Sequence, residues 1–332
     1  MNCNHSAQLL SGEKNKRPAP LSLPLAEYRF TCRASDPVSL PALADPLWRS
    51  VFGLALRRLS CAKGKRTDCA GCRLRFDCDY AFLLMGFNQR QDRDGITRTM
   101  GTIPTPLIFR CSVLDYSVRV PPGSSFSVHL VLIGMASDRL STVIRAMEAA
   151  GSLGLGRRRA RFSLEEVVQV GPQPLERLVM AGGEMIASGL PAQVAIPQVP
   201  RTIRFSFLSP YLLPSSTDLD QGLGGAHLIM QIIRRISAMH EPYAGHPLAI
   251  DFRSLKELAS TPFFLQGDLQ VEPGYSYHAN KKQFLAIRGG FLMNLSECAL
   301  LWPWLYLGQW LGVGKQAGKG FGRYLLQEVT GL

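Results

Sequence analysis

The sequence lacks a long uninterrupted apolar run, and it has no segment with the features of a secretion signal. The longest apolar stretch, residues 299–313, contains Pro303 and is shorter than the roughly 20 residues that a membrane-spanning helix needs. Residues 1–16 are mostly polar, whereas a secretion signal joins a basic start to an apolar stretch and a small-residue cleavage site. We therefore expect a cytoplasmic protein without a membrane partner.

The usual nucleotide-binding fingerprints are also missing, although a glycine-rich, cationic stretch lies close to the end of the chain. A Walker loop needs a glycine five residues before Gly-Lys-Ser/Thr, but Val313 occupies that position and Gly320 follows Lys319. The dinucleotide pattern fails as well, because Ala317 stands where a third glycine is needed. Glycines let a backbone approach its ligand closely and cations attract phosphates, so the stretch favours a polyanion such as RNA. The predicted contact residues are Gly312, Gly314, Lys315, Gly318, Lys319, Gly320, Gly322 and Arg323.

Acidic residues are outnumbered by basic ones. There are 25 Asp and Glu residues against 37 Lys and Arg residues, which gives a formal net charge of +12 and a pI near 9.5. This charge favours nucleic acid or an anionic surface as the partner, although it can also serve only to keep a protein soluble. With 332 residues, of which 46% are hydrophobic, the chain can bury a substantial core and is long enough for two domains.

The hydrophobic pattern predicts a first module with alternating strands and helices. Residues from Tyr28 to Arg33 alternate between apolar and polar, which is typical of a half-buried strand, and residues 48–59 carry apolar side chains at helical spacing. The turn Pro121-Pro122-Gly123 indicates a hairpin between two further strands. The elements predicted here are a strand from 28, a helix at 48–59, strands at 108–120 and 126–133, a helix at 138–150 and a strand from 162.

The same plan repeats after a connector near residues 191–200. The repeated order, β-α-β-β-α-β, is the ferredoxin-like or RRM-like arrangement, so we predict an α+β protein with two tandem ferredoxin-like domains. The elements predicted for the second module are a strand at 203–207, a helix at 229–236, strands near 248–252, 263–271 and 284–290, a helix at 298–310 and a strand at 323–329. The predicted boundaries are a lead-in at 1–25, a first domain at 26–195 with a Cys-rich insertion at 61–100, and a second domain at 196–332.

Both modules place a glycine-rich, cationic loop between their second helix and their last strand. In the first module, Gly154 and Gly156 precede four arginines, and the glycine-rich stretch described above has the equivalent place in the second. A single loop of this kind can also be explained as the C-terminal cap of a helix, with arginines that are simply solvated. Two loops in equivalent places favour a shared groove for an RNA backbone. The arginines predicted to bind RNA are Arg157, Arg158, Arg159 and Arg161.

Four cysteines gather in one short window. Cys61, Cys69, Cys72 and Cys78 are separated by seven, two and five residues. Four thiolates at this spacing favour a structural zinc ion, with an iron–sulfur cluster or free thiols as the alternatives. Four protein ligands leave no open position on the metal, so we expect no catalytic metal.

The order of several short motifs resembles a known family. The pieces are Trp48-Arg49-Ser50-Val51-Phe52-Gly53, the pair Cys69-Ala-Gly-Cys72, the loop from Gly154 to Arg159, and the closing glycine-rich loop. Together they resemble the RAMP superfamily of CRISPR proteins, specifically its precursor-RNA processing endoribonucleases, over most of residues 26–332. The resemblance implies that repeat RNA binds between the modules. It also implies metal-independent cleavage that leaves 2′,3′-cyclic phosphate and 5′-hydroxyl ends.

Histidine is scarce where this chemistry would use it. Cleavage through the 2′-hydroxyl needs a base, an acid and cations near the phosphorus. Many members of the family carry a histidine near the first helix, but this chain has none between His5 and His129. We therefore predict that catalysis uses Tyr277, His278 and Lys281, with Arg49 near the first helix as an alternative cation; a polar hairpin turn also explains the first three.

Three functions remain open from the sequence. The leading one is a CRISPR repeat-RNA endoribonuclease. The second is a non-catalytic RAMP subunit that holds crRNA beside other subunits of an effector complex, which the missing histidine favours. The third is a basic, zinc-stabilised scaffold that binds no RNA.

Overall fold

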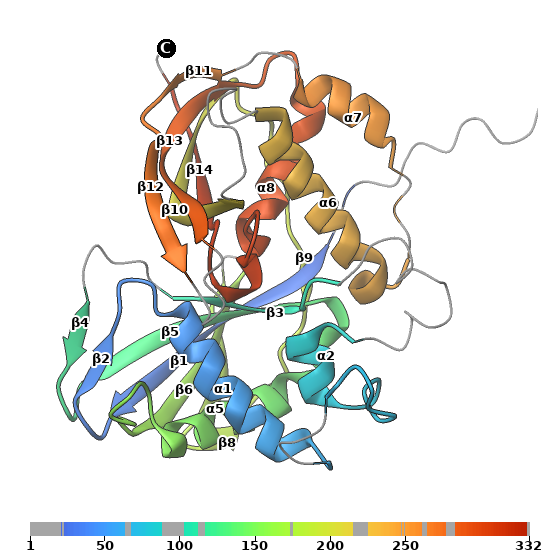
Figure 1. The fold of residues 1–332 in the computed structure, drawn as a ribbon. Helices are drawn as coiled ribbons and strands as arrows, with labels where there is room; N and C mark the ends of the chain where they lie inside the picture. Colours follow the sequence, from blue (N-terminus) through green and yellow to red (C-terminus); the bar gives the residue numbers. More distant parts are fainter. Residues whose placement is uncertain are drawn as a thin grey trace, which may run out of the picture.

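The chain folds into two modules that each combine an antiparallel sheet with helices on one of its faces (Figure 1). None of the described helices is long and apolar enough to cross a membrane. The computed structural model describes residues 21, 23–63, 68–87, 103–111, 117–172, 175–214, 225–246, 248, 250–260, 264–276 and 283–330.

The first module is arranged around a central strand, β1. Its residues alternate between the two faces of the sheet, so that Tyr28 and Phe30 join the apolar core beneath the helices. β1 pairs with β5 on one side and β6 on the other, which places Tyr28 opposite Leu130 and Gln169. The strands of this sheet are β1 (Pro24–Ala34), β3 (Leu107–Arg110), β5 (Ser125–Ile133), β6 (Phe162–Gly171), β7 (Arg177–Ala181), β8 (Glu184–Met185) and β9 (Ala192–Gln193).

The helices of the first module pack through an apolar stripe. On α1, Trp48 packs edge-on against Phe162, and Phe52 packs edge-on against Phe109. The helical elements are α1 (Asp45–Ser60), α2 (Asp79–Met85), the 3-10 turn η1 (Gly134–Arg139) and α5 (Leu140–Leu153). A separate two-stranded sheet joins β2 (Val38–Leu40) to β4 (Val118–Val120).

The second module repeats this plan around β10. Phe205 on β10 stacks between Phe291 at 4.9 Å and Tyr324 at 4.3 Å, and the Tyr324 hydroxyl donates to the Leu305 carbonyl at 2.7 Å, which fixes a helix on the sheet. The strands are β10 (Thr202–Pro214), β11 (Phe264–Gly267), β12 (Gln270–Ser276), β13 (Gln283–Asn294) and β14 (Tyr324–Glu328). The helical elements are α6 (Gly225–Ala244), α7 (Phe252–Ala259), η2 (Ala299–Leu301), α8 (Trp302–Leu311) and η3 (Ala317–Lys319).

The strand order confirms the predicted fold class. The principal strands run β3-β5-β1-β6 in the first sheet and β11-β13-β10-β14 in the second. In both modules the first strand lies between the third and the fourth, and the second strand lies beyond the third. This is the order of the ferredoxin-like β-α-β-β-α-β unit.

One apolar core continues across the junction of the modules. Ile108 and Ile133 of the first module belong to the same buried cluster as Ile236 of α6. The Tyr243 hydroxyl of α6 donates to the Pro104 carbonyl at 2.8 Å. The modules are therefore docked through buried surface as well as through hydrogen bonds.

Two predicted strands differ from the structure. No strand forms at the described residues near 248–252; instead Asp251 accepts hydrogen bonds from the backbone amides of Arg253 and Ser254 and so caps α7. The single strand expected at 108–120 is divided, because β3 pairs with β5 whereas β4 pairs with β2.

Candidate nucleic-acid interface

The closing glycine-rich loop lies against the first module. It follows α8, and its η3 segment contacts β3 and α1 (Figure 1). Gly320 has a φ of +87°, and a Cβ at this position would lie 2.3 Å from the Cβ of Asp45 on α1. A glycine is therefore required here for the modules to approach each other.

The same loop is closed by its own backbone. Val313 N donates to Gly322 O at 2.9 Å, and Gly322 N donates to Pro210 O at 2.8 Å. A Cβ on Gly322 would lie 1.8 Å from the Val313 carbonyl oxygen. Packing within the protein thus accounts for these glycines, and their predicted contact with RNA stays untested. Of the predicted set, Gly312, Gly320, Gly322 and Arg323 are buried, Gly314, Gly318 and Lys319 are half-buried, and Lys315 is exposed.

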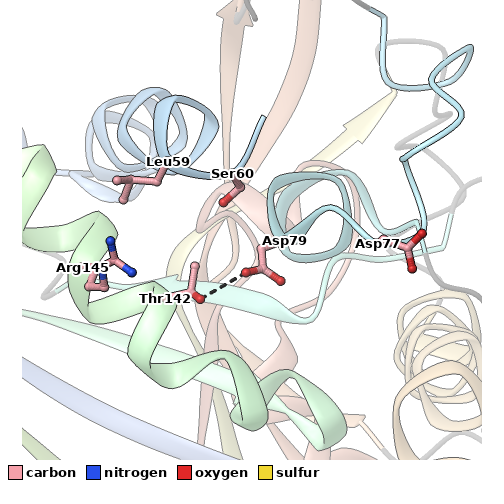
Figure 2. A pocket seen from close by; sticks show the side chains of 6 residues that line it. All are labelled: Leu59, Ser60, Asp77, Asp79, Thr142 and Arg145. Atoms are coloured by element: carbon pink, nitrogen blue, oxygen red, sulfur yellow. Dashed lines mark hydrogen bonds between the residues drawn. The ribbon is translucent and has the colours of Figure 1, made fainter. Parts of the chain in front are cut away.

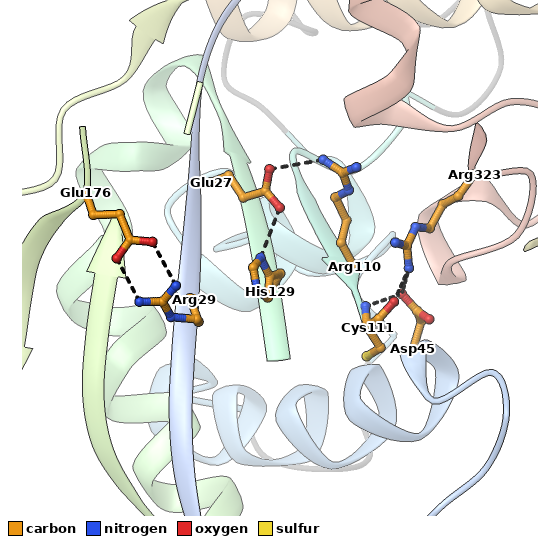
Figure 3. A network of polar contacts seen from close by, with 8 residues as sticks. All are labelled: Glu27, Arg29, Asp45, Arg110, Cys111, His129, Glu176 and Arg323. Carbon is orange, nitrogen blue, oxygen red and sulfur yellow. Dashed lines mark hydrogen bonds and ion pairs between the residues drawn. The ribbon is translucent and has the colours of Figure 1, made fainter. Parts of the chain in front are cut away.

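Arg323, which was predicted to contact RNA, instead points into the junction (Figure 3). Only 8% of the residue is exposed; its Nη1 donates to the Cys111 carbonyl and lies 3.6 Å from Asp45 Oδ1. The same Asp45 oxygen accepts from Cys111 N at 3.1 Å. Burial raises the pKa of Asp45 to about 6, although the charge of Arg323 opposes that rise.

A second polar group extends this network across the first sheet (Figure 3). Glu27 contacts Arg110 Nη1 at 3.1 Å and His129 Nδ1 at 3.1 Å. Burial opposes the ionisation of Glu27, but the hydrogen bond with His129 and the charge of Arg110 together hold its pKa below the ordinary value. Arg29, on the same strand, makes a bidentate ion pair with Glu176 at 2.9 Å. The sequence could not identify this network, because its members come from strands far apart in the chain.

Arg49 lies within electrostatic range of two cations from other elements, Arg235 and Lys319. Arg49 of α1 donates through Nη2 to Leu84 O at 2.8 Å, and Arg235 of α6 donates through Nε to Leu311 O at 3.0 Å. Lys319 of the glycine-rich loop is close enough for the charge of Arg49 to act on it. We call Arg49, Arg235 and Lys319 the junction cations.

Burial and mutual repulsion disfavour the charged forms of the junction cations. Burial, and then the charge of Arg49, lower the pKa of Arg235 to about 10 and also lower the pKa of Lys319. Nη1 of Arg49 and Nη2 of Arg235 are buried without a hydrogen-bond partner. Each of the three residues as a whole is half-buried, although the two unpaired nitrogen atoms are themselves buried. An anion that accepted these hydrogen bonds would offset the repulsion.

The first glycine-rich loop is a separate feature. A bridge between Leu155 and Ala160 closes a tight turn that exposes Arg157, Arg158 and Arg159. Arg161, just after the turn, is exposed as well and pairs with Asp36 at 3.3 Å. In Figure 1 this loop lies away from the closing loop, at the far end of the first module. The structure therefore does not bring the two loops into the shared groove that their sequence positions suggested.

The predicted catalytic residues divide into two groups. Tyr277, His278 and Lys281 lie outside the described residues, so their role stays a prediction, whereas Arg49 is one of the junction cations. The described histidines occupy other sites. His129 contacts Glu27, His227 contacts Gln231, and His240 bonds to the His246 carbonyl within the second module.

The four clustered cysteines lie between α1 and α2, and none of them forms a disulfide with another described residue. Among the described residues, no three His, Cys, Asp or Glu side chains are arranged so that they could hold a metal ion. The predicted zinc ion therefore stays a prediction.

Next to these cysteines, a polar cavity of about 210 Å³ lies between α1, α2 and α5 (Figure 2). Its lining residues are Leu59, Ser60, Asp77, Asp79, Thr142 and Arg145.

Comparison with known proteins supports the fold assignment. The family model described as AF_1859_N, N-terminal domain, matches residues 23–190. A solved Cas6 (TTHB231) product complex from Thermus thermophilus covers 92% of this chain and 99% of its own, with a TM-score of 0.50 and 14% identity. A partial Cas6-RT-Cas1–Cas2 complex covers 94% of this chain and 47% of its own, with a TM-score of 0.50 and 12% identity. No curated protein matches the sequence. The predicted resemblance is thus confirmed for the fold, which is similar to that of Cas6.

Proposed function

The chain belongs to the AF_1859_N family through its N-terminal domain, and on that premise we propose that it binds CRISPR repeat RNA and cleaves it. The Cas6-type fold supports this function class, because one of the similar structures is a Cas6 product complex. The observation that carries the proposal is the set of junction cations, Arg49, Arg235 and Lys319, where the two modules meet.

A phosphate group suits the junction cations better than any protein group near them. Leaving buried N–H groups without acceptors costs about 1–3 kcal/mol each, and more when the group is charged. Nη1 of Arg49 and Nη2 of Arg235 are such groups. Phosphate oxygens accept bidentate hydrogen bonds from arginine and carry the opposite charge. RNA at the exposed part of these residues would therefore offset the mutual repulsion of the cations.

The cations also fit the proposed cleavage. In that reaction the 2′-oxygen attacks the adjacent phosphorus while the bond to the 5′-oxygen breaks, so that a 2′,3′-cyclic phosphate and a 5′-hydroxyl form. A base takes the proton of the 2′-hydroxyl, and an acid protonates the departing 5′-oxygen. Cations stabilise the additional negative charge on the phosphorane, and the reaction needs no metal. We propose His278, Tyr277 and Lys281 for the proton transfers and Arg49 for charge stabilisation.

One observation favours a second function, a RAMP subunit that binds crRNA without cutting it. His129 contacts Glu27, His227 contacts Gln231, and His240 bonds to the carbonyl of His246, so each of these described histidines is held by a partner within its own module. A subunit of this kind would use the same cations only to bind RNA. Its further partners would be other CRISPR proteins of an effector complex.

Incubation with the cognate repeat RNA in EDTA separates the two functions. Cleavage at one site, with cyclic phosphate and 5′-hydroxyl ends, supports the enzyme; tight binding without cleavage supports the subunit. Absence of both would overturn the proposal and leave the scaffold. The His278→Ala and Tyr277→Phe variants then test the assigned proton transfers, because each should slow cleavage more than it weakens binding.

Salt dependence of binding tests the junction cations directly. Arg49→Gln and Arg235→Gln should each weaken RNA binding by about tenfold, and each should reduce the salt slope by about 0.7 to 0.9 per lost phosphate contact. Arg253→Gln is the matched control, because this arginine is highly exposed and pairs with Glu257 on its own helix. Equal slopes for the two junction variants and the control would contradict the assignment.

A further inference from the structure

His129 lies where the second module stops covering the first sheet. Residues two apart on a strand share a face, so Ser125, Ser127, His129, Val131 and Ile133 of β5 point away from the helices of the first module. Val131 and Ile133 belong to the buried cluster that contains the apolar residues of α6, whereas Ser125 and Ser127 are exposed. His129 stands between these two parts, and 31% of its side chain is exposed. A ligand at this edge of the junction can therefore reach it.

The contact with Glu27 determines which ring nitrogen of His129 can accept a proton. Glu27 Oε1 lies 3.1 Å from Nδ1 of the ring (Figure 3). Burial raises the pKa of Glu27, but the hydrogen bond with His129 and the charge of Arg110 outweigh this effect, so Glu27 is ionised at neutral pH. An ionised carboxylate only accepts hydrogen bonds, so Nδ1 carries the hydrogen and the lone pair of the neutral ring is on Nε2.

Nε2 of His129 is open to the surface. Among the described residues, His129 makes no hydrogen bond other than the one with Glu27, and Nε2 is not one of the buried nitrogen atoms that lack a partner. His240, by contrast, is fully buried and bonds to a backbone carbonyl. His129 is therefore oriented by a carboxylate on one side of its ring while the other side is free to accept a proton, which is the arrangement of a general base.

Two arginines flank His129 on the same face of the sheet. In the strand pairing, His129 lies opposite Arg29 of β1 and opposite Arg110 of β3 (Figure 3). Cross-strand neighbours of this kind have Cβ atoms about 4.5–5.5 Å apart. Arg110 is held by Glu27, whereas Arg29 pairs with Glu176 and has 32% of its side chain exposed. A phosphate beside His129 would thus meet a cation, as cleavage through the 2′-hydroxyl requires.

We propose that His129 is the general base of the RNA cleavage and that Glu27 is its positioning residue. This inference rests on the proposed function. Nε2 of His129 takes the proton of the 2′-hydroxyl, the 2′-oxygen bonds to phosphorus, and the bond from phosphorus to the 5′-oxygen breaks. Glu27 stabilises the imidazolium that forms. Protonation of the departing 5′-oxygen is then left to the group of Tyr277, His278 and Lys281.

Single-turnover cleavage by the full-length protein tests the base. His129→Gln should slow cleavage of the cognate repeat RNA by about 100-fold or more. Its Kd for the same RNA without the 2′-hydroxyl at the cleavage site should change less than about threefold. Glu27→Gln should slow cleavage by about tenfold or more, because the amide still accepts the Nδ1 hydrogen bond but no longer stabilises the imidazolium. His227→Gln is the matched control; this histidine is exposed on α6 and should be replaceable at the wild-type rate.

A substrate with sulfur in place of the departing 5′-oxygen separates a base from an acid. A thiolate is a weaker base than an alkoxide and leaves without being protonated, whereas the 2′-hydroxyl must still lose its proton. On this substrate His129→Gln should stay slow, and His278→Ala should regain most of the wild-type rate. Recovery of His129→Gln would make it the acid and overturn the assignment.

The same experiments distinguish failure of this inference from failure of the proposed function. Cleavage by the wild type together with an equal rate in His129→Gln would overturn the role of His129 and leave the enzyme. A variant that is slow only because it no longer binds RNA would overturn that role as well. Absence of cleavage by the wild type would overturn both.

Discussion

The buried ion pair between Asp45 and Arg323 permits a quantitative test of how the modules are held together. Replacing Arg323 with methionine keeps much of the side-chain volume but removes the charge and the hydrogen bond to the Cys111 carbonyl. Asp45 is fully buried, so its carboxylate would be left without its cation. Removing one partner of a buried pair costs about 3–5 kcal/mol, and we expect that loss of unfolding free energy near pH 8.

The expected loss depends on pH. The pKa of Asp45 is raised from 3.8 to about 6, so the folded state binds a proton in this range that the unfolded state does not. The stability that this group contributes is therefore present at low pH and is lost as the pH rises through about 6. At about pH 5 Asp45 is largely protonated, so removal of the Arg323 charge destabilises the folded state less than it does at pH 8. The variant should then lose only about 1–3 kcal/mol, which is the range for an unmet buried hydrogen bond.

Thermal or denaturant unfolding at the two pH values measures this difference. Arg253→Met is the matched control, because the Arg253–Glu257 pair is exposed and should contribute less than about 0.5 kcal/mol at either pH. Asp45→Asn should remove most of the pH dependence of the unfolding free energy. In the double variant with Arg323→Met, the loss of unfolding free energy should be much smaller than the sum of the losses in the two single variants. A loss in Arg323→Met that equals the control, or that does not change with pH, would refute the reasoning.

Two other contacts at the junction lead to further predictions. Gly320→Ala should destabilise the protein by several kcal/mol more than Gly182→Ala, because both glycines have positive φ but only the first would clash, with Asp45; equal melting temperatures would contradict this. Tyr243→Phe should lower the unfolding free energy by about 1–3 kcal/mol, because the Pro104 carbonyl loses its hydrogen bond. A change below about 0.3 kcal/mol would show that this bond does not help to dock the modules.

Periodicity in the sequence was sufficient to predict the repeated β-α-β-β-α-β plan. The apolar stripes of α1 and α6 and the alternation along β1 result from burial on one face, which is a local property of the sequence. One exception is α7, where a strand was predicted near residue 252. There the cap at Asp251 favours a helix, a choice that depends on side-chain hydrogen bonds rather than on the apolar pattern.

The candidate site was only partly predictable, because its residues meet through the docking of two modules. Arg49 was identified from the motif around the first helix, but Arg235 was missed, although it interrupts an isoleucine-rich run on α6. The signal available in the sequence was a cationic residue directly beside the apolar stripe of this helix. Nothing in the sequence distinguished Lys319, which approaches Arg49, from Arg323, which is buried against Asp45 four residues later.

The closing loop therefore combines two tasks in one short stretch. Its glycines and Arg323 hold the second module against α1, while Lys319 completes the junction cations. Arg49 comes from the first module and Arg235 from the second, so the cationic cluster exists only while the modules are docked. An anion that binds all three would in turn favour the docked state, since it would bind the separated modules less well. Module docking and RNA binding are thus expected to stabilise each other, and the glycine-rich sequence serves RNA binding chiefly by bringing the two modules together.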